Sequence, residues 1–169
     1  MKRIFETVHP WKVVQTKIDH ADNCPAESVT SLGNGYMGAR GNYEEYYTGT
    51  TLKGTYIAGV WVPDKTRVGW WKNGYPRYFG KVINAPDFLS FDLYLNGQRF
   101  DLAKANLLSF YREVDMKTGL MSRKMDVQTP MGVLTIRSSR FFSCAQKELA
   151  CMHYCIESHD FEGQVRLET

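Results

Sequence analysis

The sequence predicts an all-β fold, an antiparallel β-sandwich with little helix. Several short runs alternate apolar and polar residues or are rich in β-branched and aromatic residues, as strands are. An Asn-Gly pair separates two such runs, which is typical of a tight hairpin. With 43% hydrophobic and 14% aromatic residues among 169, the chain can bury a core, and general disorder is excluded.

In the first part of the chain, residues 11–18 partly alternate and predict a half-buried strand. Residues 19–27 read as turns. Four glycines occur within residues 33–41, and since each interior glycine costs a helix about 1 kcal/mol, they fit bends or close backbone approach in a sheet. Residues 55–62 predict a buried strand that Pro63 closes.

Residues 63–87 carry little periodicity and predict a long excursion rather than a regular element. Such a loop in a compact domain is usually functional or disordered. Its many aromatic side chains speak against disorder.

The next segment holds the strongest local signal. Residues 91–95 and 98–102 flank Asn96-Gly97 and predict a hairpin with a type I′ turn, because both central residues tolerate a positive φ. Residues 106–114 could form a strand or a short helix.

The last part predicts strands again. Residues 120–129 and 133–142 flank a Pro-Met-Gly turn at 130–132, and residues 149–157 form another strand. A further strand begins at residue 164, and the sequence stops inside it. A final strand normally has a closing turn and a neighbour, so we expect this domain, residues 1–169, to be incomplete at its C-terminus.

The charge balance is mild: 21 Lys and Arg against 18 Asp and Glu give 21 − 18 = +3, too little to indicate nucleic acid or a membrane surface. No apolar run reaches the 18 residues of a membrane span. The first residues are not followed by the apolar stretch of a signal peptide. We therefore expect a cytoplasmic chain in which Cys24, Cys144, Cys151 and Cys155 are reduced.

Two motifs suggest a cofactor or metal site, but the sequence around each lacks the features that such a site requires. Residues 33–38 match the spacing of a dinucleotide fingerprint, yet no buried strand precedes them and no helix follows. Cys151, His153 and Cys155 share one face of a strand, but positions i and i+4 lie about 13 Å apart there, too far for one metal. A structural role is favoured for both motifs.

The adjacent carboxylates Glu44 and Glu45 would point to opposite faces of a strand, so they cannot flank one bond as a catalytic pair. Solvated charges are the favoured interpretation, although one of them could face a site. No nucleophile elbow, P-loop or His-Glu-x-x-His motif occurs.

Residues 67–81 interleave aromatic side chains with Arg, Asn and Lys. Packing against the sheet, another domain or another subunit is the favoured interpretation. The same composition suits a pyranose ring, whose C–H face stacks on an aromatic ring, and single-stranded nucleic acid, whose bases stack. The low net charge argues against nucleic acid.

At this point the residues resemble a known family. Residues 32–45 are similar to the Gly-Asn-Gly-Tyr-Met-Gly-x-Arg-Gly-Asn-x-Glu-Glu run of the glycoside hydrolase family 65 disaccharide phosphorylases. Residues 54–60 follow at the family's spacing. Residues 63–76, together with 1–6 and 10–13, resemble the maltose phosphorylase branch of that family. The resemblance covers essentially the whole chain.

The resemblance implies a galactose-mutarotase-like supersandwich, present here in part, that precedes an (α/α)6 barrel. The family's enzymes cleave an α-glucoside with inorganic phosphate and invert the anomeric centre. In the intact enzyme, maltose and phosphate would give β-glucose 1-phosphate and glucose, with phosphate as co-substrate and no cofactor or metal. Implied partners are the missing barrel, a second subunit of a homodimer and the disaccharide, and neither nucleic acid nor a membrane.

The acid and the phosphate-binding residues of the family lie on the barrel, so no residue here is expected to be catalytic and the isolated chain should be inactive. The alternative is a free-standing carbohydrate-binding module. Seven residues are candidates for substrate binding at the active-site entrance: Trp70, Trp71, Tyr75 and Arg77 in an entrance loop, with Asn34, Tyr36 and Arg40 in a neighbouring turn.

Overall fold

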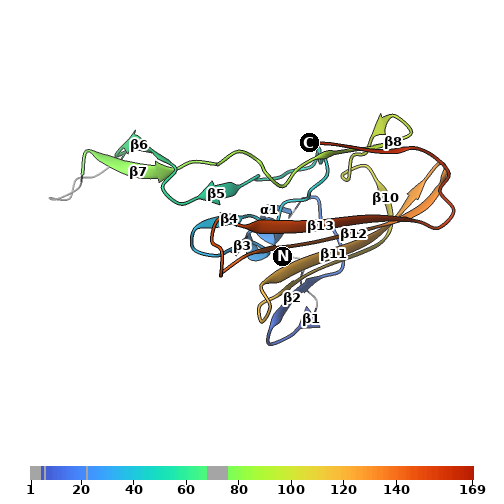
Figure 1. The fold of residues 1–169 in the computed structure, drawn as a ribbon, viewed down its shortest axis with the longest axis horizontal. Helices are drawn as coiled ribbons and strands as arrows, with labels where there is room; N and C mark the ends of the chain where they lie inside the picture. Colours follow the sequence, from blue (N-terminus) through green and yellow to red (C-terminus); the bar gives the residue numbers. More distant parts are fainter. Residues whose placement is uncertain (1–4, 6, 22, 68–75) are drawn as a thin grey trace.

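A six-stranded antiparallel sheet forms the larger layer of the computed structural model, which describes residues 5, 7–21, 23–67 and 76–169 (Figure 1). The strand order is β1-β2-β10-β11-β12-β13. The bounds are Thr7–Val8 for β1, Lys12–Gln15 for β2, Asn106–Asp115 for β10, Leu120–Thr129 for β11, Gly132–Phe142 for β12 and Ala150–Ser158 for β13. The predicted strands therefore form one meander, extended by the N-terminal segment.

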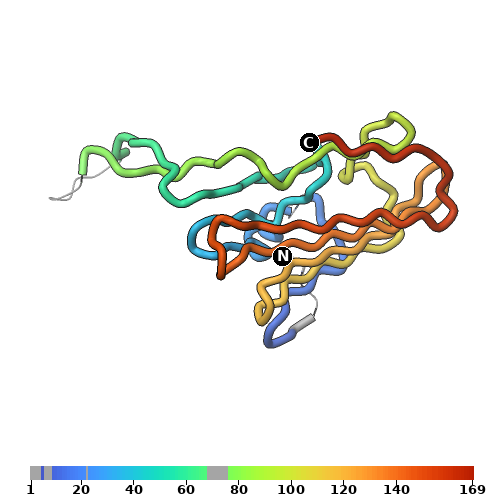
Figure 2. Tube along the Cα trace, viewed as in Figure 1, coloured from blue at the N-terminus to red at the C-terminus, as the bar shows by residue number. Residues whose placement is uncertain are grey.

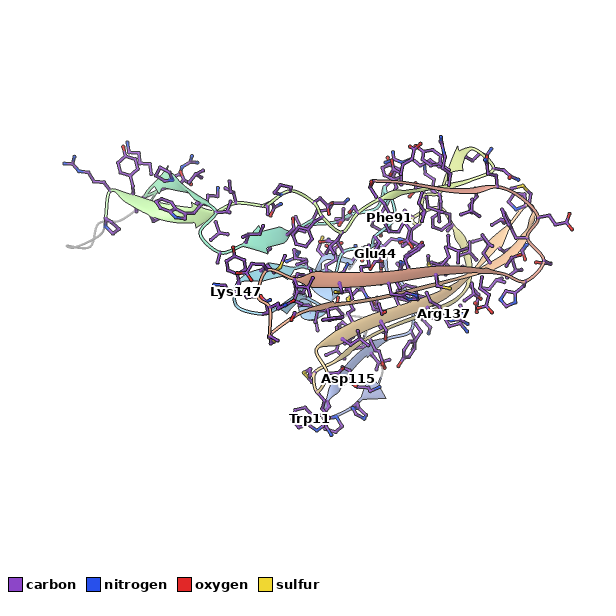
Figure 3. The ribbon with its side chains drawn as sticks, in the orientation of Figure 1. Trp11, Glu44, Phe91, Asp115, Arg137 and Lys147 are labelled. Carbon is purple, nitrogen blue, oxygen red and sulfur yellow. The ribbon has the colours of Figure 1, made fainter. Side chains whose placement is uncertain are left out.

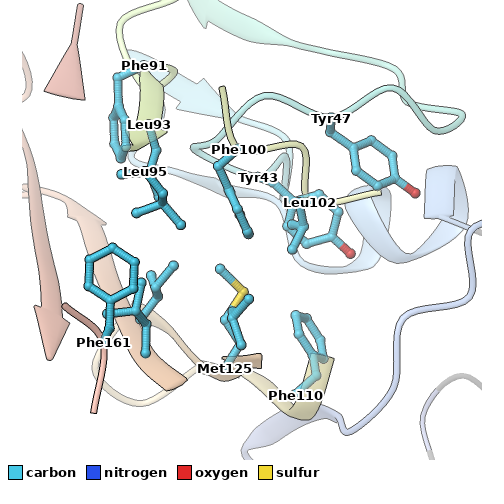
Figure 4. Close-up of a cluster of buried hydrophobic side chains, with 13 residues drawn as sticks. Tyr43, Tyr47, Phe91, Leu93, Leu95, Phe100, Leu102, Phe110, Met125 and Phe161 are labelled. Carbon is cyan, nitrogen blue, oxygen red and sulfur yellow. The ribbon is translucent and has the colours of Figure 1, made fainter. Parts of the chain in front are cut away.

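The second layer is a three-stranded sheet ordered β14-β8-β9, formed by β8 (Asp92–Leu95), β9 (Gln98–Arg99) and β14 (Val165–Glu168). Apolar side chains of the two layers meet in one core (Figure 4). Leu93 faces it from the smaller sheet, and Met125 and Ile136 face it from the larger one, all at most 1% exposed. The predicted antiparallel β-sandwich is confirmed.

Local turn chemistry explains the hairpins. Asn96 (φ 48°) and Gly97 (φ 76°) both have positive φ, so the predicted tight turn between β8 and β9 is confirmed. Gly132 (φ 120°) opens β12 after the predicted second turn. Residues 106–114, for which strand or helix was open, lie in β10, whose register with β11 shifts between Leu107 and Ser109.

The prediction of turns alone for residues 19–27 is wrong, because helix α1 (Asn23–Val29) begins there. Seven residues are too few for a helix that is stable by propensity. Tertiary contacts hold it instead: the buried Glu27 carboxylate accepts hydrogen bonds from the Leu52 N–H at 2.9 Å and from the Thr51 hydroxyl. A third small sheet, ordered β3-β4-β5, lies beside it (β3, Leu32–Gly33; β4, Met37–Ala39; β5, Thr55–Ile57).

The prediction of one buried strand over residues 55–62 is also wrong. The chain bends at Gly59 (φ 84°), which separates β5 from β6 (Trp61–Lys65). Among the described strands, β6 pairs with β7 alone (Tyr78–Val82), which lies within the segment predicted to be an irregular excursion. This two-stranded hairpin, which we call the arm, projects beyond the end of the sandwich (Figures 1 and 2).

The final predicted strand is present as β14, which pairs with β8. In the described part of the chain, no helix has the length and apolar character needed to cross a membrane.

Candidate functional site at the base of the arm

The glycine-rich run forms the β3–β4 hairpin, and Asn34 holds its turn. The Asn34 side-chain oxygen accepts the backbone N–H groups of Tyr36 at 3.0 Å and Met37 at 2.9 Å. Its amide donates to the backbone carbonyls of Ser143 at 2.7 Å and Lys147 at 2.9 Å. Asn34 therefore ties the turn to the connection between β12 and β13.

Two of the glycines are required by geometry. Gly35 has a φ of 85°, a conformation that other residues rarely adopt. A Cβ on Gly41 would lie 1.8 Å from the Thr30 hydroxyl oxygen, where the backbone of the run passes against the end of α1. The Gly41 N–H also donates to the Glu27 carbonyl at 2.8 Å. The run is thus a packing device between the helix and the sheets.

Arg40 points toward α1 rather than into an open site. Its guanidinium donates to the Cys24 carbonyl at 2.9 Å and to the Ser28 hydroxyl at 2.8 Å, and lies 3.9 Å from the Glu27 carboxylate. These contacts bind β4 to the helix, so the structure gives Arg40 a positioning role.

An open cleft of about 460 Å³ lies where the β3–β4 hairpin, the bend at Gly59 and the base of the arm meet. Tyr36, Tyr56 and Trp61 bring aromatic rings to it from three segments. The Lys147 ammonium, from the loop labelled in Figure 3, lies 5.0 Å from the centre of the Tyr36 ring, a cation–π distance. Among the described residues the lining contains no carboxylate, and its polar side-chain groups are the hydroxyls of Tyr36 and Tyr56 and the indole of Trp61.

The arm exposes large apolar side chains on both of its faces. Trp61 is 57% exposed and Tyr78 60%, and Val62, Phe79 and Val82 are exposed as well. Arg77, a predicted site residue, is exposed beside the start of β7, and its carbonyl accepts the Thr66 N–H at 3.0 Å. Trp70, Trp71 and Tyr75 lie outside the described residues. An isolated two-stranded hairpin is marginal in water, so this surface fits a contact with another body.

The interpretation of Glu44 and Glu45 as solvated charges on a strand is wrong, because both are fully buried at a bend. One nitrogen of Arg123 donates to Glu44 at 2.7 Å and to Glu45 at 2.6 and 2.8 Å. Arg140 donates to Glu44 at 3.2 Å, and the Tyr154 hydroxyl donates to Glu45 at 2.5 Å. Figure 3 shows Glu44 between the two layers.

Arg123 belongs to a polar row that crosses the inner face of the large sheet. Gln15, Arg112, Arg123, Ser138 and Tyr154 are successive cross-strand partners, one from each of five strands. Within the described part of the chain, no carboxylate forms an ion pair with Arg112. Arg112 donates to the Gln15 side-chain oxygen at 2.6 and 3.0 Å, and its third donor reaches a backbone carbonyl of the glycine-rich run at 2.7 Å.

The neighbouring arginines keep the Glu44 carboxyl ionised. Burial alone raises the pKa of the Glu44 carboxyl, but Arg123 and Arg140 outweigh it, and the pKa lies below its ordinary value. Glu44 is therefore ionised at neutral pH and keeps no proton to donate. Burial and the Glu45 carboxylate raise the pKa of Tyr154, which keeps its hydroxyl protonated as a donor. The charges hold the layers together.

The cysteine and histidine motif lies on strand β13. Cys151, His153 and Cys155 follow one another along β13, and no cluster of metal-ligating side chains occurs among the residues that the structure describes.

A second cleft, of about 540 Å³, lies beside Tyr46 and Asp101. The Arg99 guanidinium lies 3.4 Å from the centre of the Tyr46 ring and occupies one face of it.

Sequence reasoning missed Tyr56 and Trp61, which it placed in one buried strand. Gly59 between them was the available signal, because a glycine inside an apparent strand often marks a bend. Of the predicted residues, the structure brings Tyr36 to the cleft, holds Asn34 and Arg40 nearby in structural contacts, and places Arg77 on the arm.

Comparisons with known proteins identify the family. Residues 13–169 match the family described as glycosyl hydrolase family 65, N-terminal domain. The chain is 50% identical over 153 residues to maltose phosphorylase of Bacillus subtilis (strain 168), covering 90% of this chain and 20% of that protein. It is 30% identical over 160 residues to α,α-trehalose phosphorylase of Thermoanaerobacter brockii, covering 92% and 21%.

A solved structure described as "Putative kojibiose phosphorylase from human microbiome" matches with a TM-score of 0.82 and 26% identity, covering 94% of this chain and 21% of that one. The chain thus spans about a fifth of the length of the relatives it matches. The matched residues, the shared β-sandwich and the glycine-rich hairpin lead to one conclusion: this chain belongs to glycosyl hydrolase family 65, as its N-terminal domain.

Proposed function

We propose that this chain is the non-catalytic N-terminal domain of an inverting α-glucoside phosphorylase that acts on maltose. The observation that carries the proposal is the 50% identity to a maltose phosphorylase over 90% of the chain. The buried carboxylates support a non-catalytic role, because Glu44 and Glu45 are both committed to Arg123 inside the core. The intact protein would supply the acid from an (α/α)6 barrel absent from these 169 residues.

In the intact enzyme, the C1–O bond between the two glucose units breaks, and one carboxylic acid protonates the departing oxygen. Phosphate attacks C1 from the opposite face, so the new C1–O bond has the inverted configuration. The products are β-glucose 1-phosphate and glucose. Inorganic phosphate is the nucleophile, and the reaction requires no cofactor or metal.

The domain's own contribution is architectural. Its arm and cleft combine exposed aromatic side chains with four cationic residues against one acidic residue among residues 61–67 and 76–82. This surface suits packing on the barrel, support of a homodimer and a place at the active-site entrance, where Trp70, Trp71, Tyr75 and Arg77 would lie on the loop and Asn34, Tyr36 and Arg40 near its base. The four free thiols are consistent with a cytoplasmic enzyme.

The test compares the 169-residue chain with the same gene extended past Thr169 through a barrel. Each protein is incubated with maltose and phosphate, and glucose 1-phosphate is measured. We expect product from the extended protein only. Product from the 169 residues alone would refute the non-catalytic role, and an extended protein that cleaves trehalose or kojibiose but not maltose would refute the substrate.

A second candidate function is carbohydrate binding by the free chain, which the three aromatic rings of the cleft favour. Maltose titration followed by tryptophan fluorescence tests it. A saturable change that Trp61→Ala abolishes, and that Trp11→Ala leaves intact, would support binding. Trp11 is a suitable control because it is also exposed (48%) and lies before β2, near the opposite edge of the large sheet from β13, labelled in Figure 3.

A further inference from the structure

The second cleft, of about 540 Å³, lies beside β8 and β9, at the opposite end of the molecule from the arm (Figure 1). Its described lining residues all lie within residues 46–131, and neither β13 nor β14 contributes to them. The middle of the chain therefore builds this cleft, which does not depend on the last strands. Its volume is typical of a small-molecule site, about 300–1,000 Å³.

The buried part of the lining is apolar. Leu95 and Phe100 reach the cleft from β8 and from the segment after β9, and Val127 reaches it from β11. All three are at most 8% exposed. Ala105 and Met131 add apolar surface beside them. Such a lining suits a ligand that has at least one apolar face.

The charged side chains on the rim of the cleft already have partners. The Arg99 guanidinium donates to the Asp92 carboxylate at 2.6 Å. The Lys104 ammonium lies 3.5 Å from the Asp101 carboxylate. That carboxylate also accepts the Thr48 hydroxyl at 2.6 Å and the Thr48 N–H at 3.1 Å. An anionic ligand would have to compete with these carboxylates for the two cations, so the rim favours a neutral ligand.

Three side-chain amides on the same rim have hydrogen-bonding capacity to spare. Among the described residues, nothing bonds to the amides of Gln98 and Asn106, and Gln128 donates only to the Thr129 carbonyl, at 2.9 Å. Asn106 and Gln128 are direct cross-strand partners on β10 and β11, so they lie side by side. An amide carries a donor and an acceptor together, and a row of such groups suits the neighbouring hydroxyls of a sugar.

We propose that this cleft binds a neutral sugar of one or two pyranose units, as a site separate from the cleft at the base of the arm. The C–H face of the sugar packs on the apolar lining, and its hydroxyl groups bond to Gln98, Asn106 and Gln128. This inference stands on the residues of the cleft and does not depend on the proposed phosphorylase function.

Proton–nitrogen correlation NMR of the chain tests the site, because it locates binding residue by residue. Maltose and glucose are titrated into the Trp61→Ala variant, which lacks the ring that sugar binding at the arm would require. We expect saturable shifts, with millimolar dissociation constants, in the side-chain amide signals of Gln98, Asn106 and Gln128.

Two variants test the role of the amides. Gln98→Met and Asn106→Leu keep the approximate size of each side chain but remove its hydrogen-bonding groups. Losing one hydrogen bond to a sugar hydroxyl should weaken binding about tenfold. Both residues are exposed, so the core is untouched. Gln146→Met is the matched control, because Gln146 is also exposed and lines neither cleft, and it should bind sugar as tightly as the parent does.

The absence of saturable shifts in this cleft would overturn the proposal, and so would cleft variants that bind as tightly as Gln146→Met. Glycerol and inorganic phosphate test the ligand class. Equal shifts with glycerol, or shifts with phosphate but not with maltose, would overturn a sugar site. Because the NMR titration uses a chain with an unaltered cleft, it remains decisive if a cleft variant fails to fold. None of these results bears on the phosphorolysis test.

Discussion

Removing the charge of Arg123 should reveal how much the buried cluster contributes to stability. One guanidinium nitrogen lies within 2.8 Å of oxygens of both Glu44 and Glu45, and all three side chains are at most 1% exposed. Arg123→Met keeps most of the volume but leaves Glu45 without a cationic partner in the core. Breaking a buried ion pair in this way costs about 3–5 kcal/mol.

The assay is urea unfolding of the chain, followed by circular dichroism. With a urea dependence of about 2 kcal/mol per molar for a domain of this size, the midpoint should fall by about 2 M. The control is Arg137→Met on the neighbouring strand β12. Arg137 also pairs with a glutamate, Glu157, but both side chains are about half exposed, and an exposed pair contributes little.

Equal losses from the two substitutions would refute the reasoning, because burial would then have no bearing on the cost. A midpoint for Arg123→Met within 0.3 M of wild type, an interval of about 0.6 kcal/mol at that urea dependence, would refute it as well. In that case the two carboxylates would have found other partners or protons without loss.

Three further outcomes are expected. Because the pKa of Glu44 is lowered in the folded state, the ionised carboxylate stabilises the fold fully above the unfolded-state pKa, about 4.3. This stabilisation is lost as the pH falls below that value and through the folded-state pKa. In acid-unfolding curves, Glu44→Gln should therefore lose less stability between pH 5 and 3 than wild type does. Gly35→Ala should cost about 1–2 kcal/mol in chemical denaturation because of the positive φ, whereas Gly35→Asn, which tolerates that conformation, should cost less. Ile136→Ala in the core should lower the free energy of unfolding by about 2–5 kcal/mol, while Val165→Ala on the exposed β14 should change the same measurement much less.

The parts of the fold that local chemistry determines could be predicted from the sequence. The turn at Asn96 and Gly97 follows from two residues that tolerate positive φ, and the long strands from β11 to β13 follow from alternation and composition. For β10 the sequence left strand and short helix open. The family could also be recognised, because the glycine-rich run carries specific residues at a fixed spacing.

The features that depend on distant contacts could not be predicted. Helix α1 is held by Glu27, whose partners Thr51 and Leu52 lie more than 20 residues away. The burial of Glu44 and Glu45 depends on Arg123, almost 80 residues away along the chain. The cleft forms only where the bend at Gly59 brings Tyr56 and Trp61 toward the glycine-rich hairpin. Periodicity is a local property and contains no information about such encounters.

The polar row across the large sheet has a consequence for how the strands find their alignment. A purely apolar inner face would tolerate a strand whose register shifts by two residues, because each apolar side chain would be replaced by another on the same face. Here such a slide would move Arg112 away from Gln15, or Arg123 away from Glu44 and Glu45. Either shift would leave an unpaired guanidinium in the apolar core. The row therefore specifies the register of five strands, because only the native alignment gives each of its polar side chains a partner.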